Sequence, residues 1–240
     1  MPSSQIAELR EKLDALNVAG RKVVPFKGLP VMEKAFFPGG NGLFDGSEAT
    51  ITVGGTIVLG SNFGCRSDFI KSDGTLVRSD ETRTSSTWKG LYRMLLPQTH
   101  IQLSRCFFTN AWPFLHEGKS NDTGGLAPAW LSDESLMNEC GYLFRETLSI
   151  VQPKLIVALG AAAAFMGHLW PNELGEWRSN RVSSIDKLPI ASIEHNGATI
   201  VCTAITHPSH SNSWRRQLPY QDTRGEIRLL QEAAIQAGLA

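Results

Sequence analysis

Four short runs of apolar residues recur along the chain, and each run is continuous instead of alternating between apolar and polar positions. The runs occupy residues 56–60, 106–110, 155–160 and 199–205. Continuous apolar runs of this length, ended by polar or turn-forming residues, are typical of strands that are buried on both faces of a sheet. The pattern therefore predicts four buried strands.

The segments around these runs have the spacing of helices. Residues 133–151 place apolar side chains on one helical face, residues 161–169 and 225–237 predict two further helices, and residues 3–17 predict a short N-terminal one. Strands that alternate with helices favour a parallel sheet covered by helices. We predict an α/β fold, a three-layer sandwich with a central, mainly parallel four-stranded sheet flanked by helices.

Two other segments refine this picture. His195-Asn196-Gly197 precedes the fourth run and predicts a tight hairpin turn, so that one edge of the sheet becomes antiparallel. Residues 25–55 are rich in proline and glycine, a composition that interrupts regular structure. We expect one domain over residues 1–240, in which residues 1–55 form a helical and irregular lead-in.

Composition limits the classes of function. Hydrophobic residues make up 42% and charged residues 19%, and no segment has the apolar length of a membrane span. We expect a soluble, cytoplasmic monomer without a membrane partner. Lys+Arg and Asp+Glu balance at 23 each, so any contact with nucleic acid must come from a local patch. The four cysteines are far apart, which predicts separate reduced thiols.

Polar residues follow three of the apolar runs. Asn62 follows the first, Asn110 ends the second and His207 follows the fourth. Ligands of open α/β sheets bind beyond the carboxyl ends of the strands, so these side chains are the first candidates for function. Taken singly, each also has a structural interpretation, since Asn is favoured in turns and His-Pro-Ser can cap a helix.

Taken together, the strand endings resemble the motifs of the uracil-DNA glycosylase superfamily. The resemblance rests on Gly60-Ser61-Asn62, Phe108-Thr109-Asn110 and His207-Pro208-Ser209, and residues 153–164 are similar to the third strand and helix of the microbial branches. It covers residues 55–215 in family order. It implies a hydrolase of base excision repair that cleaves the N-glycosidic bond of uracil or a related deaminated base in DNA, with no cofactor.

Two features depart from the most active branches. Asn62 stands where those members have Asp or Glu, although the mismatch-specific and single-strand-selective branches also use Asn there, and Phe63 replaces a common proline. The iron-sulfur branches need four cysteines, including a pair near the N-terminus, whereas the first cysteine here is Cys65. We therefore expect no cluster.

The resemblance implies a role for each of the three polar residues. An imidazole N–H of His207 would stabilise the negative charge that develops on the departing base. The carbonyl oxygen of Asn62 would orient the attacking water, because an amide is not basic enough to deprotonate it. Asn110 offers a donor and an acceptor that match uracil, and that cytosine cannot match without an amide flip. Turn-forming or backbone-satisfying roles remain the alternatives for Asn62 and Asn110.

Three aromatic residues are candidates for stacking on the extruded base. Trp88 begins the segment Trp88-Lys89-Gly90-Leu91, which is similar to the aromatic-x-Gly segment of the family, and Phe63 and Phe69 compete for the role. A tryptophan in an amphipathic segment also commonly belongs to the core.

Small polar, aromatic and basic residues follow the His-Pro-Ser motif. We expect them to form a loop that faces DNA, with guanidinium groups on phosphates; its residues are Ser209, Ser211, Trp214, Arg215 and Arg216. The alternative is a solvated surface turn.

Other classes of function are disfavoured. Cys202, His207 and His210 lack a fourth zinc ligand, and we expect no metal. The nucleophile's place in a serine-hydrolase turn is held by Asn62, and no glycine-rich phosphate loop follows a strand. The remaining competitor is a superfamily member with little or no catalysis that binds nucleic acid or a base-like ligand.

Overall fold

A six-stranded sheet forms the centre of the molecule. The computed structural model describes residues 4–18, 23–24, 41–42, 51–62, 65, 89–116, 130–179, 188–208 and 223–240. Within these residues the strand order is β2-β4-β3-β6-β8-β7. The strands are β2 (Asn41–Gly42), β3 (Thr56–Asn62), β4 (Cys106–Trp112), β6 (Leu155–Leu159), β7 (Ile190–His195) and β8 (Ala198–Ile205). A separate antiparallel pair joins β1 (Val23–Val24) to β5 (Leu115–His116).

The four predicted strands are confirmed as β3, β4, β6 and β8, and they run parallel to one another. The antiparallel edge is also confirmed, because β7 joins β8 through a turn in which Asn196 has φ 49° and Gly197 has φ 76°. The predicted number of strands, four, was too low, because the sheet has six in the described residues. The short parallel strand β2 lies in the Pro- and Gly-rich lead-in, where two residues carry no periodic signal.

Helices lie between and beyond the strands. The longer ones are α1 (Ser4–Asp14), α5 (Glu134–Val151), α6 (Ala162–Leu169) and α9 (Thr223–Gln236), and the short ones are η3 (Lys89–Leu95), η4 (Leu96–Gln98), η5 (Leu103–Arg105) and η7 (Gly175–Ser179). Helix α5 begins where the Asp133 side chain accepts a hydrogen bond from the Leu136 N–H at 3.0 Å. It ends at Val151, and the next residue, Gln152, has a left-handed backbone with φ 45°.

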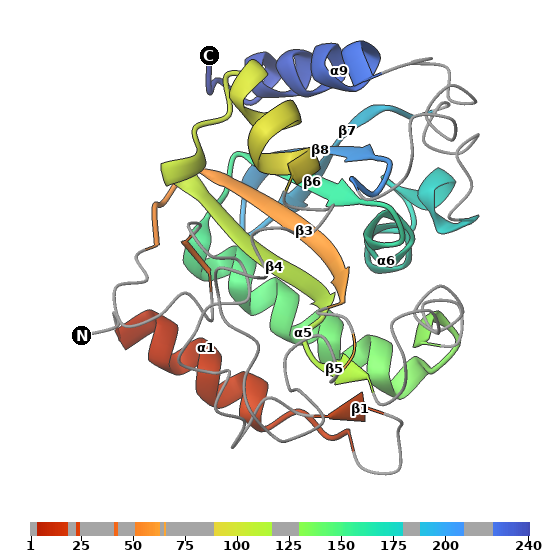
Figure 1. The fold of residues 1–240 in the computed structure, drawn as a ribbon. Coiled ribbons are helices and arrows are strands. Elements are labelled where there is room, and N and C mark those ends of the chain that lie inside the picture. Colours follow the sequence, from red (N-terminus) through yellow and green to blue (C-terminus); the bar gives the residue numbers. More distant parts are fainter. Residues whose placement is uncertain are drawn as a thin grey trace, which may run out of the picture.

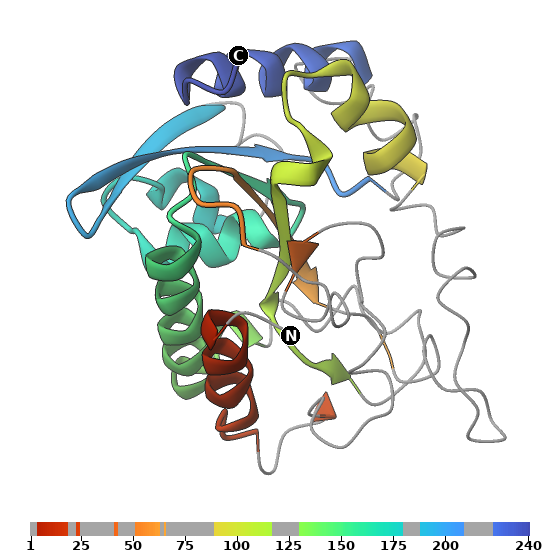
Figure 2. The same ribbon diagram turned by 90° about the vertical axis from the view of Figure 1, so that its left-hand side faces the viewer.

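The helices form a layer on each side of the sheet, as predicted. Helices α9 and η3 lie on one side, and α5 and α1 lie on the other (Figures 1 and 2). Helix α6 lies beside α5, since the Arg145 side chain donates to the Leu169 carbonyl at 2.9 Å. Helix α9 packs on β8 and β6. The arrangement is a three-layer α/β sandwich.

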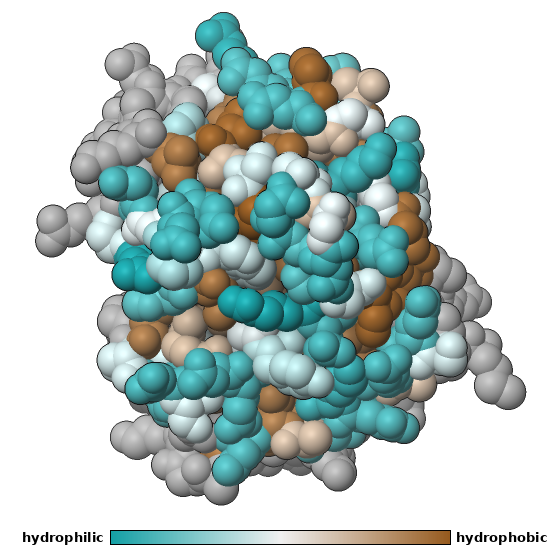
Figure 3. All heavy atoms as spheres, turned by 180° about the vertical axis from the view of Figure 1, so that it is seen from behind, coloured by the Kyte–Doolittle hydropathy of each residue, from teal (hydrophilic) through white to brown (hydrophobic). Residues whose placement is uncertain are grey.

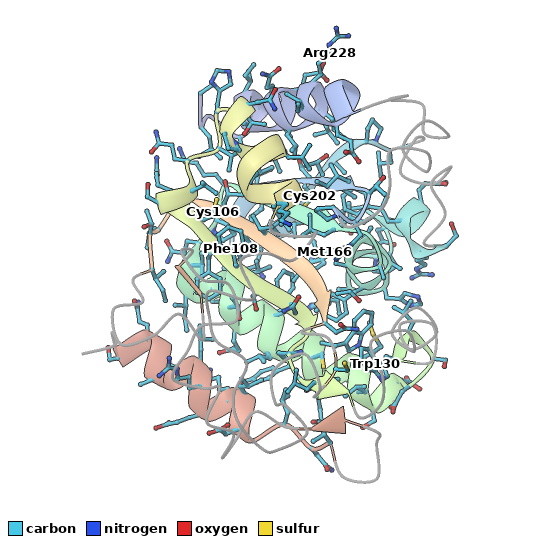
Figure 4. All side chains as sticks on the ribbon, in the orientation of Figure 1. Cys106, Phe108, Trp130, Met166, Cys202 and Arg228 are labelled. Atoms are coloured by element: carbon cyan, nitrogen blue, oxygen red, sulfur yellow. The ribbon has the colours of Figure 1, made fainter. Side chains whose placement is uncertain are left out.

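The core is built from the strands and from the inner faces of α5, α6 and α9. Every residue of β4 and β6 is buried. All four cysteines are buried thiols, and Cys106 and Cys202 lie inside the molecule (Figure 4). Hydrophilic residues predominate on the face opposite to that of Figure 1, with apolar residues in smaller patches (Figure 3). Within the described ranges, none of the helices has the length and apolarity to cross a membrane.

Candidate functional site

The carboxyl ends of four parallel strands meet at one edge of the sheet, which we call the carboxyl edge. Asn62 is the last residue of β3, Asn110 lies in the second half of β4, and His207 is the second residue after β8. The strands are in register here, because Leu59 pairs with Thr109 on one side and with Ala158 on the other. The three sequence-predicted polar residues therefore lie at the same edge.

Asn110 lies against a glycine of the neighbouring strand. Gly60 is its partner in the ladder between β3 and β4, and a Cβ atom added to Gly60 would lie 2.1 Å from Asn110 Oδ1. No side chain can occupy that space, so Gly60 leaves room for the amide. Side chains two residues apart on a strand share a face, which puts Asn62 on the same face as the Gly60 position.

The Asn110 amide has an unused donor. The residue is 4% exposed, and its Nδ2 has no hydrogen-bond partner among the described residues. A buried donor without a partner costs about 1–3 kcal/mol, so such groups are rare and call for an explanation. An acceptor supplied by a ligand would explain this one.

His207 is placed by a second glycine. Gly160 follows β6 directly, its φ is +56°, and a Cβ atom added there would lie 3.0 Å from His207 Cβ. The Gly160 N–H donates to the Ile205 carbonyl at 2.9 Å, which joins the ends of β6 and β8. The imidazole-bearing residue is half-buried at this junction. Glycine suits position 160 for two reasons: its backbone is left-handed, and His207 lies so close that a side chain would crowd it.

A third glycine, Gly90, brings the start of η3 to the same edge. A Cβ atom added to Gly90, in η3, would lie 2.8 Å from both Cβ and the carbonyl oxygen of Pro208. Helix η3 therefore packs directly on the residue after His207. Trp88 itself lies outside the described residues, and so do Phe63, Phe69 and the predicted DNA-facing loop, whose residues are Ser209, Ser211, Trp214, Arg215 and Arg216.

An aromatic cluster lies beside the end of β4. Trp112 is fully buried, and its ring centroid is 5.4 Å from that of Trp130 and 5.5 Å from that of Phe165. Its register partner is Asn62. The indole Nε1 is a second buried donor with no partner in the described part of the chain. Sequence reasoning missed Trp112, because a tryptophan within an apolar strand looks like ordinary core.

A small cavity lies between β4 and α5. Thr109 and Asn110 line it from the strand, and Phe144 and Thr147 line it from the helix. Asn62 and His207 do not line this cavity.

The thiols of the core are poorly suited to metal binding. Burial raises the pKa of Cys106 to about 12 and raises the pKa of Cys202 further, so neither is a ready thiolate. Cys202 also lies within β8 with no exposed surface. No group of three His, Cys, Asp or Glu residues in the described ranges is arranged to hold a metal ion. His210, which with Cys202 and His207 would lack a fourth zinc ligand, lies outside those ranges.

The fold and site together define the class of protein. The chain has a parallel sheet between helical layers, and at the carboxyl edge of that sheet it carries a buried amide with an unused donor. A family model described as the Uracil DNA glycosylase superfamily matches residues 79–230, well over half of the chain. The chain therefore belongs to the uracil-DNA glycosylase superfamily.

The matched region contains Asn110 and His207, whereas Asn62 precedes it. No curated protein matches the chain. The assignment of the asparagine in the first motif and the expected lack of an iron-sulfur cluster remain predictions from the sequence.

Proposed function

We propose that this protein hydrolyses the N-glycosidic bond of uracil or a related deaminated base in DNA. The observation that carries the proposal is the buried Asn110 amide, whose Nδ2 has no partner in the described structure and whose Oδ1 lies over Gly60. Membership of the superfamily supports a glycosylase-like activity and DNA as the partner.

The Asn110 amide suits uracil on chemical grounds. Nδ2 would donate to O4 of the base, and Oδ1 would accept from N3–H. Cytosine has a donor at position 4 and no hydrogen on N3, so without an amide flip it would leave both groups of the amide mismatched. A site that hydrogen-bonds its substrate discriminates strongly, because the wrong ligand leaves buried polar groups unpaired.

Asn62 and His207 complete the proposed chemistry. Bond cleavage leaves an oxocarbenium-like sugar and an anionic base, so charge must be stabilised while water is held near the sugar carbon. His207 would donate an N–H to the developing anion, and Asn62 would accept a hydrogen bond from the water. Trp88, Phe63 and Phe69 are the candidates for stacking, and Arg215 and Arg216 are those for phosphate contact.

The direct test is base release from oligonucleotides. Single-stranded and duplex DNA containing uracil, xanthine or hypoxanthine is incubated with the protein and then treated with alkali, which breaks the strand at each abasic site. Asn110→Ala should lower release by about 10²–10³-fold, because it removes both hydrogen bonds to the base. Asn196→Ala is the matched control, since Asn196 lies at the opposite end of β8.

Asn62→Ala and His207→Ala separate the remaining roles. Each should abolish or greatly reduce release while oligonucleotide binding stays largely intact, because neither residue is proposed to provide the main binding energy. A variant of Asn62 with full excision would remove this residue from the mechanism.

The second candidate function is binding without catalysis. It is favoured by Asn62, whose amide cannot act as a general base. Oligonucleotide binding without strand scission on any substrate would support this candidate. A lack of both binding and scission would exclude both candidates.

A further inference from the structure

One carboxylate of helix α9 is buried at the carboxyl edge of the sheet. Glu226 lies in the first turn of α9 and is 1% exposed. Its Oε1 accepts a hydrogen bond from the backbone N–H of Thr206 at 3.2 Å. Thr206 is the residue immediately before His207. Figures 1 and 2 show α9 on one side of the sheet, where it packs on β8 and β6.

The position of this hydrogen bond matters because β8 has just ended. The Ile205 carbonyl, in the last residue of the strand, accepts from the Gly160 N–H. The next N–H along the chain, that of Thr206, is outside the ladder and takes its partner from α9. Two successive backbone groups are therefore fixed by two different elements, one in the sheet and one in the helical layer.

The chain after Thr206 is confined on both sides. A Cβ atom added to Gly160 would lie 3.0 Å from His207 Cβ, and one added to Gly90 of η3 would lie 2.8 Å from Pro208 Cβ. Neither glycine contact fixes the direction in which the backbone leaves β8. The Glu226 hydrogen bond adds to that constraint, because the Thr206 N–H and the Ile205 carbonyl belong to one peptide plane, which Gly160 holds at the carbonyl and Glu226 holds at the N–H.

A buried carboxylate is normally avoided unless hydrogen bonds compensate it. Glu226 accepts a hydrogen bond from Thr206, and it lies in the first turn of a helix, where negative charge is favoured. The other glutamate of α9, Glu232, is exposed. Glu226 is thus the buried glutamate of α9, and one of its oxygens contacts the end of β8.

We propose that Glu226 is a positioning residue for His207, acting through the Thr206 backbone. This inference rests on the proposed function, in which His207 donates to the departing base. The property required of residue 226 is an acceptor oxygen at this position, so glutamine should replace glutamate and an apolar residue of the same size should not.

Three variants test the proposal. Glu226→Met fills a similar volume without an oxygen acceptor, Glu226→Gln keeps an acceptor, and Glu232→Ala is the matched control on the exposed face of α9. Single-turnover base release at saturating enzyme should fall by about tenfold or more in the Met variant, with oligonucleotide affinity changed less than about threefold. The Gln variant should stay within about threefold of wild type, and so should the control.

A second measurement does not depend on glycosylase activity. Hydrogen exchange of the Thr206 amide, followed by NMR, should accelerate by about tenfold or more in Glu226→Met and stay near the wild-type rate in Glu226→Gln. The imidazole signals of His207 should shift in the Met variant alone. If wild type releases no base, the proposed function fails, and these signals still decide whether Glu226 positions the chain.

Several results would overturn the proposal. A folded Met variant with wild-type base release would do so, as would an unchanged Thr206 amide. A loss of release in Glu226→Gln equal to that in Glu226→Met would show that the acceptor is not the required property. If the Met variant does not fold, the Gln variant decides, since a tenfold fall in its release contradicts the proposal and a rate within threefold, with the Thr206 amide still protected, supports it.

Discussion

Histidine and asparagine side chains lie at both ends of the parallel strands, but their hydrogen bonding differs between the two ends. At the amino ends of β6 and β8, which we call the amino edge, the Ser149 hydroxyl lies 2.9 Å from His195 Nε2 and accepts from Asn196 Nδ2 at 3.0 Å. The same hydroxyl donates its hydrogen to the Arg145 carbonyl at 3.0 Å. Because its one hydrogen is used, the His195 Nε2–H must be the donor to Ser149.

We call Ser149, His195 and Asn196 the amino-edge clamp. Their hydrogen bonds join the β7–β8 hairpin to α5 and pair polar groups of the three side chains with one another. At the carboxyl edge, by contrast, the Asn110 amide keeps a buried donor without a partner in the described structure. A histidine, an asparagine and a serine close together are thus not evidence of a functional site. The better sign of a functional site is a buried polar group that has no hydrogen-bond partner despite the energetic cost.

The largest effect should follow from filling the space beside Asn110. Gly60→Ala places a Cβ atom where Asn110 Oδ1 now lies, so the amide must move. Base release should fall by about 100-fold, since small displacements in a site cost that much. Gly175→Ala is the control, because an added Cβ atom there meets nothing within 4 Å. Wild-type release by Gly60→Ala would contradict the role of Asn110.

A change in the amino-edge clamp should affect stability and spare activity. Ser149→Ala leaves His195 and Asn196 without their shared acceptor, and the free energy of unfolding should fall by about 1 kcal/mol. Denaturant unfolding measures this change, with Ser135→Ala on the exposed part of α5 as the control. A fall in base release at temperatures where the variant is folded would argue against the contrast between the two edges.

A smaller effect should come from the backbone at the end of α5. Gln152 has φ 45°, a left-handed conformation that glycine adopts without steric cost. Gln152→Gly should raise the free energy of unfolding by about 0.5–1 kcal/mol. Gln152→Ala keeps the strained conformation and should give no gain. Thermal unfolding of the two variants side by side makes the comparison, and equal melting temperatures would contradict it.

The smallest effect should be a dependence of stability on pH that arises at the amino edge. Burial, and then the nearby Arg145 charge, lower the pKa of His195 below its ordinary 6.5. The folded state therefore favours the neutral imidazole, and this contribution is complete above pH 6.5 and is lost as the pH falls through the lowered pKa. Wild type should lose more thermal stability between pH 7.5 and 5 than His195→Gln does. Parallel pH profiles would show that His195 does not titrate in this way.

Much of the fold was predictable because its strands are buried on both faces. Residues 106–112 and 155–159 are entirely buried, which is why their sequences are continuously apolar. The amphipathic patterns of α5 and α9 were equally clear. The pairs β1–β5 and β2–β4 were not predictable, because each involves a strand of only two residues and depends on long-range contacts.

The site was predictable only in part. The strand order puts the carboxyl ends together, so the approach of Asn62, Asn110 and His207 to one edge followed from the pattern. The close contacts of Gly60 and Gly160 with Asn110 and His207 did not, because they join residues about 50 positions apart. The sequence gives no sign that Glu226 is buried, because a glutamate on an amphipathic helix is ordinarily solvated, and only the packing of α9 on the sheet reveals its burial.

The burial of all four cysteines has a practical consequence for following this protein in solution. Thiol reagents attack the thiolate, and the raised pKa values of Cys106 and Cys202 suppress that form in the folded chain. A cysteine introduced at an exposed position such as Lys89 or Arg228 can therefore be labelled with a fluorophore while the native thiols stay in place. The rate at which the native thiols are slowly labelled then measures how often the core opens.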